Sequence, residues 1–396
     1  MNTSRHLLFF SILLLTYLCV IKIIVYHDRV YLNDIKTLQY FRFDRDLDYK
    51  KNKDLSKIFE EAFSSLDINI KKSNKYLNSD ILFFESYDLI DLYFKKLHYP
   101  HDCKYIYGVN NTDSFVNKAE LYKNYEKIYN KEIIKYFLPE TYYDLKMKTL
   151  MELPYNNQTV YIAKKNIQQQ KGLILFKSYD EIKDKYDKLI SVVQKVLQDP
   201  FLVNGRKINI RIYLLVKIIH DKIYFYIYNN GFMYYTPEMF KKYSTNPDEV
   251  ITTGYIDRSV YVENPLTLQD FYNYLGKNNS QKLKSNIYNL FRSFKEVFSR
   301  QLLFHNRNIP GTKFSVFGCD VAPDTFLNCK LIEINKGPDL SYKDDRDKHV
   351  KLNMVRDMFK LVGLEKYGNT SHSNNNNNNN NNIQKSIVDT GFIQVI

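Results

Sequence analysis

The sequence predicts a large α+β protein, and three observations lead to this fold class. The chain has 396 residues, enough for two or three lobes. Short apolar runs that alternate with polar residues predict strands joined by tight turns, most clearly over residues 200–218 and 314–340. Charged segments with apolar residues at helical spacing, such as residues 344–362, predict helices that pack on those strands.

Residues 6–26 predict a single transmembrane helix. The stretch Leu7–Ile21 carries no charged residue, and Ile23–Tyr26 extends the apolar run to about 20 residues, enough to cross a bilayer. Lys22 interrupts the run near its end, where a lysine side chain can reach the interface. Because no small-x-small cleavage site follows, we expect an uncleaved anchor. A buried core helix is the alternative interpretation.

Composition narrows the classes of partner. The formal net charge of +13 favours acidic partners. No compact basic and aromatic motif of a nucleic-acid module is present, which disfavours nucleic acid as the partner. The four cysteines have neither CxxC spacing nor flanking histidines, so the pattern argues against a zinc site and against a disulfide scaffold.

Two lysines stand near the ends of predicted elements. Residues 114–145 predict a capped helix followed by a loop at Pro139, with Lys118 in the first helical turn. Residues 159–176 predict strand, polar loop and strand, and Lys164 falls at the end of the first strand. A flexible loop with a lysine at its base can enclose phosphate groups. A solvated helix residue and a plain hairpin are the alternative interpretations.

A predicted helix over residues 179–191 leads into an apolar strand over residues 192–197. This strand carries Gln194 and Lys195. Backbone groups of such a segment can meet the edge of an adenine ring, and the lysine beside it can reach phosphate.

Residues 200–218 predict a hairpin in which three polar side chains share one strand face. Asn204-Gly205 marks the tight turn. Alternate residues of a strand project to the same side, which groups Lys207, Asn209 and Arg211, while the intervening isoleucines face the core. The polar row is either a solvated strand face or part of a binding site.

Residues 314–340 predict a second hairpin that brings hard oxygen ligands together. Glu333 and Asn335 project to one side of the return strand, and Ile332 and Ile334 to the other. In the simplest register Asp320 lies on the same polar side. Two carboxylates and one amide oxygen suit Mg²⁺ that bridges substrate phosphates. A half-solvated hairpin with a polar outer face is the alternative.

The carboxyl-terminal part predicts three features in order. Residues 344–362 predict an amphipathic helix that packs a row of Val, Met and Leu side chains, and Gly363 is its expected cap. The unbroken asparagine run over residues 374–382 is typical of a disordered low-complexity segment. Residues 383–396 predict a short strand that docks back onto the protein.

The runs LVNGRKINIRIYLLV and VFGCDV…LIEINKGPDL resemble the tubulin-tyrosine ligase and tubulin-tyrosine-ligase-like family, which are ATP-grasp ligases that add amino acids to proteins. The similarity covers roughly Phe115 to Gly363. It implies an ATP-grasp fold, with two α+β lobes that grip ATP and an N-terminal α/β lobe. The implied divisions are an anchor at 6–26, an N-terminal lobe at 27–150, a central lobe at 151–200, a C-terminal lobe at 201–365 and an Asn-rich tail at 366–396.

The resemblance also implies roles for individual positions, carried over by motif match. Nucleotide binding falls on Lys118, Lys164, Gln194, Lys195, Leu197, Lys207, Asn209 and Thr252, Mg²⁺ binding on Asp320, Glu333 and Asn335, and catalysis on Arg211, Lys207 and Glu333.

The implied reaction is ATP- and Mg²⁺-dependent formation of an amide bond through an acyl phosphate. The implied partners are an acidic protein tail, such as that of tubulin, and a free amino acid, and we expect a monomer. Because the chemistry needs ATP, we expect the globular part to be cytosolic on a single-pass membrane anchor.

Two positions and one segment depart from the family pattern. Asn209 stands where the family has an Asp in its KxDxR strand, and Tyr234 stands where the family has an Arg three residues after a Gly. The family's His-Leu-Thr-Asn segment is reduced to VITTG, which retains Thr252. The loss of the Arg, replaced by Tyr234, and of the His bears on amino-acid and acceptor specificity more than on ATP binding. The alternatives are an inactive, membrane-anchored protein that binds tubulin, and a ligase for a substrate other than tubulin.

Overall fold

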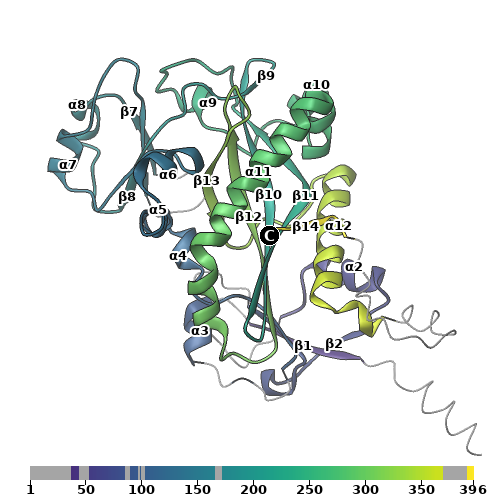
Figure 1. Ribbon diagram of the computed structural model, residues 1–396. Coiled ribbons are helices and arrows are strands. Elements are labelled where there is room, and N and C mark those ends of the chain that lie inside the picture. The colour runs from purple at the N-terminus through teal and green to yellow at the C-terminus, as the bar shows by residue number, and fades with distance from the viewer. Residues whose placement is uncertain are drawn as a thin grey trace, which may run out of the picture.

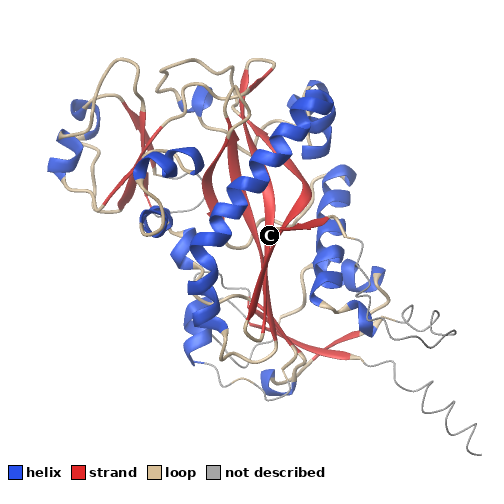
Figure 2. Cartoon of the chain, viewed as in Figure 1, coloured by secondary structure: helices blue, strands red, loops and turns tan. Residues whose placement is uncertain are grey.

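A computed structural model shows a mixed α/β protein with two β-sheets and helices packed around them (Figures 1 and 2). It describes residues 37–43, 53–84, 90–96, 99, 103–165, 172–368 and 390–396. These residues contain many strands and many helices, as expected of an α+β protein. The membrane helix that belonged to the same fold prediction is corrected below.

The expected single-pass membrane topology is not supported. No helix within the described ranges is both long and apolar enough to cross a bilayer. The longest of them, Leu268–Asn306, carries charged residues along its length. The predicted anchor, residues 6–26, lies outside the described residues. The predicted transmembrane helix, and the membrane localisation that depended on it, are therefore not supported.

The larger sheet joins a parallel half to an antiparallel half. Its strand order is β14-β11-β10-β12-β4-β3-β1-β2, with β9 on β10 and β13 on β12. The strands β4, β3, β1 and β2 pair in parallel in that order, and β4 is also parallel to β12. The strand β10 is antiparallel to both β11 and β12. The strands are β1 (Leu38–Phe43), β2 (Ile70–Lys72), β3 (Ile81–Phe84), β4 (Tyr105–Tyr107), β9 (Leu202–Val203), β10 (Arg206–Ile219), β11 (Lys222–Tyr235), β12 (Thr312–Pro323), β13 (Cys329–Asn335) and β14 (Phe392–Gln394).

The smaller sheet is antiparallel and has the order β5-β8-β6-β7. Its strands are β5 (Thr141–Tyr143), β6 (Tyr161–Lys165), β7 (Leu173–Phe176) and β8 (Ile190–Lys195). The helix predicted over residues 179–191 is wrong beyond its first turn, Tyr179–Ile182. The chain turns at Asp187, whose carboxylate accepts a hydrogen bond from the Leu189 amide at 2.8 Å, and such local bonds compete with a helix.

The helices vary widely in length. They are α2 (Lys57–Ser65), α3 (Ile90–Lys96), α4 (Asp113–Val116), α5 (Lys118–Glu126), α6 (Lys131–Phe137), α7 (Met147–Met151), α8 (Tyr179–Ile182), α9 (Pro247–Val250), α10 (Val260–Glu263), α11 (Leu268–Asn306) and α12 (Asp345–Val362), with short 3₁₀ turns at Tyr76–Asn78 and Glu365–Tyr367. Figure 1 shows α11 lying across the larger sheet. It is bent at Gly276, which has a positive φ of 72°.

The α12 helix forms as predicted. The Asp344 carboxylate caps its start by accepting from the Asp347 amide at 2.8 Å. Gly363 ends it in the left-handed conformation, with φ at 88°. Its Phe359 ring stacks on Phe63 of α2 with ring centroids 4.3 Å apart. This contact fixes α12 against the N-terminal part of the chain.

An aromatic cluster holds the hairpin of the larger sheet in place. The Phe115 ring of α4 is fully buried and makes edge contacts with Phe294 and Phe298 of α11 and with Phe317 of β12. Aromatic pairs of this geometry stabilise a fold beyond their buried area. The cluster therefore ties β12 to the helices around it. The short carboxyl-terminal strand predicted within residues 383–396 is confirmed as β14, which pairs with β11.

Candidate active site

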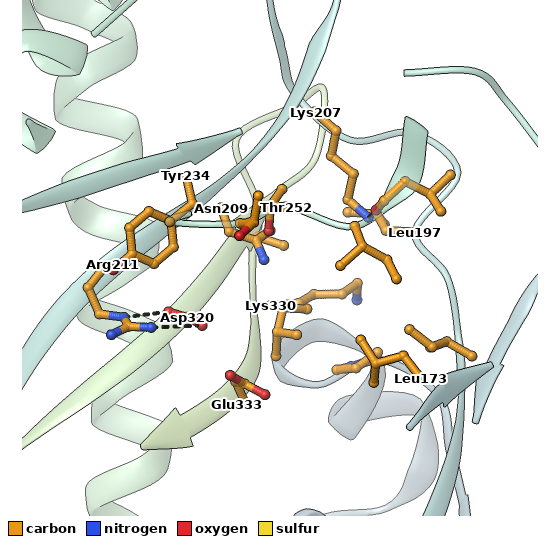
Figure 3. A pocket seen from close by; sticks show the side chains of 18 of the residues that line it. Leu173, Leu197, Lys207, Asn209, Arg211, Tyr234, Thr252, Asp320, Lys330 and Glu333 are labelled. Atoms are coloured by element: carbon orange, nitrogen blue, oxygen red, sulfur yellow. Dashed lines mark hydrogen bonds and ion pairs between the residues drawn. The ribbon is translucent and has the colours of Figure 1, made fainter. Parts of the chain in front are cut away.

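A cavity of about 860 Å³ lies between the smaller sheet and the β10–β12 region of the larger one (Figure 3). This volume is in the range of small-molecule binding sites. All twelve positions that were predicted to form the site line it, and they are Lys118, Lys164, Gln194, Lys195, Leu197, Lys207, Asn209, Arg211, Thr252, Asp320, Glu333 and Asn335. Strand alternation places the polar residues of β10 here, because the intervening isoleucines are buried on its other face.

Three side chains form a row across neighbouring strands on the cavity wall. Arg211 of β10 is paired with Asp320 of β12, which in turn is paired with Glu333 of β13. The Arg211 guanidinium makes two bonds to the Asp320 carboxylate, at 2.6 Å from Nε and 3.2 Å from Nη2. Figure 3 shows this pair beside Glu333. The predicted hairpin register is confirmed at this point.

The hairpin differs from the prediction immediately afterwards. The register shifts after Asp320, so that Leu331 pairs with Val321 and Ile332 becomes an extra residue on β13. Such a β-bulge redirects side chains. Ile332 was predicted to face the core, but it lines the cavity. Leu331 is buried in its place.

Opposite shifts in acidity distinguish the two carboxylates. Burial raises the pKa of Asp320 to about 6, although the Arg211 guanidinium opposes this shift. Burial acts against ionisation of Glu333 as well, but the ammonium groups of Lys118 and Lys164 outweigh it and hold the Glu333 pKa at about 2. Lys118 Nζ lies 3.6 Å from Glu333 Oε2. Glu333 is therefore ionised at neutral pH.

Lys118 and Lys164 approach the cavity from different elements. Lys118 is the first residue of α5, directly after the cap residue Asn117, whose side chain accepts from the Ala119 and Glu120 amides. Lys164 projects from β6 and is 6% exposed, and its burial lowers its pKa to about 8. The family resemblance implied that both contact the nucleotide, and for Lys164 the sequence pattern also indicated contact with phosphate.

Lys207 is a second buried lysine on the cavity wall. Its ammonium group donates to the Val250 carbonyl at 2.9 Å. Burial, and to a smaller extent repulsion from Lys164, lowers the Lys207 pKa to about 8. A cavity with two desolvated ammonium groups favours an anionic ligand, because a negative charge would offset their loss of hydration.

The end of β8 and the segment after it provide a less polar wall. The Gln194 side chain is turned to Thr141, to which it donates at 2.9 Å, and Lys195 is paired with Glu140 at 3.1 Å. Leu197 lines the cavity, and Figure 3 shows it facing the same space as Leu173. The wall suits a flat apolar ring with polar edges. The further apolar side chains on it are Ile162, Leu173 and Leu175.

The predicted Mg²⁺ ligands fit a magnesium ion by their chemistry. Asp320, Glu333 and Asn335 offer only oxygen donors besides one amide nitrogen, which lies 3.2 Å from Glu333 Oε1. No group of three or more His, Cys, Asp or Glu that could hold a metal occurs in the described part of the chain. A set of two carboxylates is typical of Mg²⁺ that takes its other ligands from water and phosphate.

One end of the cavity was not anticipated from the sequence. It is formed by charged residues from the segment before α10 and from α12 and the loop leading to it, and no recognisable motif marks them. Lys351 of α12 is buried and lies 3.4 Å from Asp347. The residues that line this end are Arg258, Asp339, Lys343, Asp347 and Lys351.

The mixed α/β fold and the cavity between its sheets, lined by lysines and carboxylates, are consistent with the ATP-grasp architecture that the family resemblance implied. The tubulin-tyrosine ligase family model matches residues 101–373. This match covers well over half of the 396 residues, and the chain therefore belongs to the tubulin-tyrosine ligase family.

Curated relatives match at low identity. A probable tubulin polyglutamylase of Rattus norvegicus is 26% identical over 197 residues, which are 48% of this chain and 42% of that protein. A probable tubulin polyglutamylase of Caenorhabditis elegans is 26% identical over 261 residues, covering 58% of this chain and 59% of that protein. A tubulin glycylase of Tetrahymena thermophila is 26% identical over 212 residues, covering 48% and 20%. The chain thus matches less than two thirds of the length of these relatives.

Proposed function

We propose that this protein is an ATP-dependent ligase that forms an amide bond between an amino acid and a carboxylate of a protein. The observation that carries the proposal is the row Arg211–Asp320–Glu333, which shares one cavity with Lys118 and Lys164. Five charged side chains from the two sheets and α5 converge there on a space of ligand size. Family membership makes ligation the activity that this arrangement fits best.

The cavity walls divide naturally between the parts of a nucleotide. The segment Gln194–Leu197 and the apolar wall beside it would hold the adenine ring. Lys164 and Lys207 would neutralise phosphate oxygens, and Lys118 would act with them from the start of α5. Asn209 and Thr252 line the wall between these groups. Asp320, Glu333 and Asn335 would hold Mg²⁺, which when bound neutralises charge on the phosphates.

The proposed reaction has two steps. A carboxylate attacks the terminal phosphorus of ATP, which forms an acyl phosphate and releases ADP. An amine then attacks the acyl carbon, and phosphate leaves as the amide forms. Both steps need placement and charge neutralisation more than a side-chain nucleophile. Arg211 would stabilise the acyl phosphate, since its guanidinium lies at the carboxylate row, held there by Asp320.

The proposed acceptor is an acidic protein tail, with tubulin as the first candidate. Two observations support it: the relatives bear the names of tubulin polyglutamylases and a tubulin glycylase, and the net charge of +13 favours an acidic partner. The proposed second substrate is a free amino acid, and the relatives' names favour glutamate or glycine as much as tyrosine. A monomer is sufficient, because one chain supplies the whole cavity.

The decisive experiment uses the purified full chain with ATP and Mg²⁺, with and without tubulin or a glutamate-rich peptide. We expect acceptor-dependent release of ADP and phosphate, and a mass increase of the acceptor that identifies the added residue. ATP binding without turnover on any acceptor would favour a non-catalytic binding protein. ATP turnover that ignores acidic peptides would favour a ligase for another substrate. Absence of ATP binding would contradict the proposal.

A further inference from the structure

A second cavity of about 610 Å³ lies between the end of α5 and the second half of α11. We call it the α11 groove, and the residues that define it are Lys127, Arg292, Lys295, Glu296, Arg300 and Ile396. Its α11 residues recur at three- and four-residue spacing, so they lie along one face of that helix. None of the described residues lines both this groove and the active-site cavity. The groove is therefore a separate site.

The α11 groove carries an excess of positive charge. Four of its defining residues are cations, and none of the four forms an ion pair within the described part of the chain. The Glu296 carboxylate accepts a hydrogen bond from the Tyr129 hydroxyl. The carboxyl group of Ile396, counted as an anion, still leaves more cations than anions in the lining. An anionic partner would therefore be attracted here without displacing an existing ion pair.

The cations of the groove are bonded to uncharged groups or are open to a ligand. The Lys127 ammonium donates to the Asn124 side-chain oxygen at 2.9 Å, and the Lys295 ammonium donates to a main-chain carbonyl at 3.1 Å. Arg292 and Arg300 are exposed, and neither donates a hydrogen bond to another described residue. Their guanidinium groups keep their donors for a partner.

Contacts between α5 and α11 fix the two sides of the groove. The Tyr125 hydroxyl lies 3.1 Å from the Ser293 hydroxyl. The Tyr125 ring also contacts the Phe298 ring, with centroids 6.2 Å apart. A partner would therefore order only the ends of the charged side chains, and not the backbone that carries them.

The spacing of the cations suits an extended acidic peptide. Arg292 and Arg300 are eight positions apart on α11, which is about 12 Å along the helix axis. An extended chain covers this distance in about four residues and places alternate side chains about 7 Å apart on one side. Successive glutamate or aspartate side chains would meet successive cations, whereas a single phosphate group would meet one end of the row. None of the described residues that line the groove is aromatic, which disfavours single-stranded nucleic acid, because its bases stack on aromatic rings.

We propose that the α11 groove is a second binding surface for an acidic protein tail, in which a run of glutamate or aspartate side chains lies along Arg292, Lys295 and Arg300. Clusters of arginine recur in the recognition of acidic segments. The inference rests on the proposed function for the kind of partner, and it adds a surface that holds this partner outside the active-site cavity.

The α5 helix connects the groove to the active site. Lys118 is its first residue and lines the active-site cavity, and Lys127 follows its last residue and lines the groove. These lysines are nine positions apart, about 14 Å along the helix axis. An extended tail spans that distance in about five residues. Binding at the groove would therefore raise the local concentration of a second part of the same tail at the cavity.

The test measures binding of a fluorescently labelled, glutamate-rich peptide to the full chain by anisotropy at low salt and without nucleotide. We expect Arg292→Glu with Arg300→Glu to weaken binding by about tenfold or more, because two attractions become repulsions. Arg292→Gln with Arg300→Gln removes the charges without reversing them and should cause a smaller loss. In the ligation assay, the charge-reversed variant should raise the KM for the acidic acceptor and leave the KM for ATP unchanged.

The matched control is Lys277→Glu with Lys282→Glu, which makes the same change of net charge at exposed positions of α11 outside both cavities. It should bind the peptide as the wild type does, and circular dichroism checks the fold of every variant. Equal losses in the two charge-reversed variants, or no loss in Arg292→Glu with Arg300→Glu, would overturn the inference.

Two further outcomes separate this inference from other partners and from the proposed function. Tighter binding of an oligothymidylate or of anionic lipid vesicles that depends on Arg292 and Arg300 would assign the groove to another partner and overturn the peptide site. Peptide binding that depends on these arginines, in a protein that ligates no amino acid, would overturn the proposed function and leave the peptide site in place.

Discussion

Asp320 of β12 and Glu333 of β13 are directly opposed in the hairpin, yet their environments shift their pKa values in opposite directions. Asp320 is engaged by one guanidinium, and its burial raises its pKa to about 6. Glu333 is held near pKa 2 against the effect of burial by Lys118 and Lys164. Asp320 is therefore paired with Arg211 of the same chain, and Glu333 is the more available ligand for a cation.

We expect Glu333→Gln to abolish ATP-dependent ligation while the protein remains folded. The substitution removes a negative charge and one of the two carboxylates, and a lost metal ligand of this kind reduces transition-state stabilisation by several kcal/mol. Turnover should fall by at least about a hundredfold in an assay of acceptor-dependent ADP release. Circular dichroism checks the fold, and Glu263→Gln, at an exposed position outside the cavity, is the control. Near-normal turnover in Glu333→Gln would remove Glu333 from the mechanism.

The pH dependence of ATP binding should report Lys164. Its pKa is about 8, below the ordinary 10.5, because it is buried. A polyanion favours the protonated lysine, so affinity should be level below pH 8 and should fall as the pH rises above 8. Calorimetric titrations from pH 6.5 to 9.5 measure this. Lys164→Met should weaken binding at pH 7 and flatten the profile, although Lys207, also near pKa 8, would keep part of it.

Lys164 should also affect the stability of the fold, and its contribution should increase over the pH range in which the affinity for ATP decreases. Because its pKa is lowered in the folded protein, the folded chain releases a proton near pH 8 that the unfolded chain keeps until about pH 10.5. Its contribution to the free energy of unfolding therefore increases between these values. At pH 7, Lys164→Met should raise the free energy of unfolding by about 3 kcal/mol, because the pKa falls from 10.5 to about 8. Lys222→Met, at an exposed position, should leave it unchanged. A destabilised Lys164→Met protein would contradict the burial argument.

The Arg211–Asp320 pair should show strong coupling in a double-mutant cycle. The two side chains are only 13% and 11% exposed, so breaking the pair leaves a buried charge without a partner. We expect Arg211→Met and Asp320→Asn each to lower the free energy of unfolding by about 3–5 kcal/mol. The double variant should lose less than the sum of the two single losses. Urea unfolding provides the free energies. The exposed pair Lys183–Asp180 is the control and should couple by less than about 0.5 kcal/mol. Additive losses at Arg211 and Asp320 would contradict the prediction.

Local periodicity explains why most of the site could be predicted. The alternation that puts Lys207, Asn209 and Arg211 on one face is fixed within a single strand, and it needs no knowledge of the rest of the fold. The turn at Asn204-Gly205 likewise follows from the positive φ angles that these residues tolerate. Both features are determined by residues next to each other in the chain.

Features that depend on distant contacts could not be predicted in this way. The bulge at Ile332 adds one residue to β13 without changing its composition, so the sequence does not mark it. Lys351 reaches the cavity because α12 packs against α2 through Phe359 and Phe63, which are almost 300 positions apart. The continuous sheet formed by β4 and β12 is also a long-range pairing. Such contacts follow from the whole fold.

The strand β14 should stabilise the sheet that carries Tyr234. Its residues pair with Tyr226–Tyr228 of β11, and the Phe392 ring lies 5.0 Å from the Tyr228 ring. Phe392 is 8% exposed, so Phe392→Ala should lower the free energy of unfolding by about 3 kcal/mol. Ile393 points the other way and is 48% exposed, so Ile393→Ala should change it by less than about 0.5 kcal/mol. Urea denaturation of the two variants measures the difference. Equal effects at the two positions would mean that β14 does not pack on β11 as the structure shows.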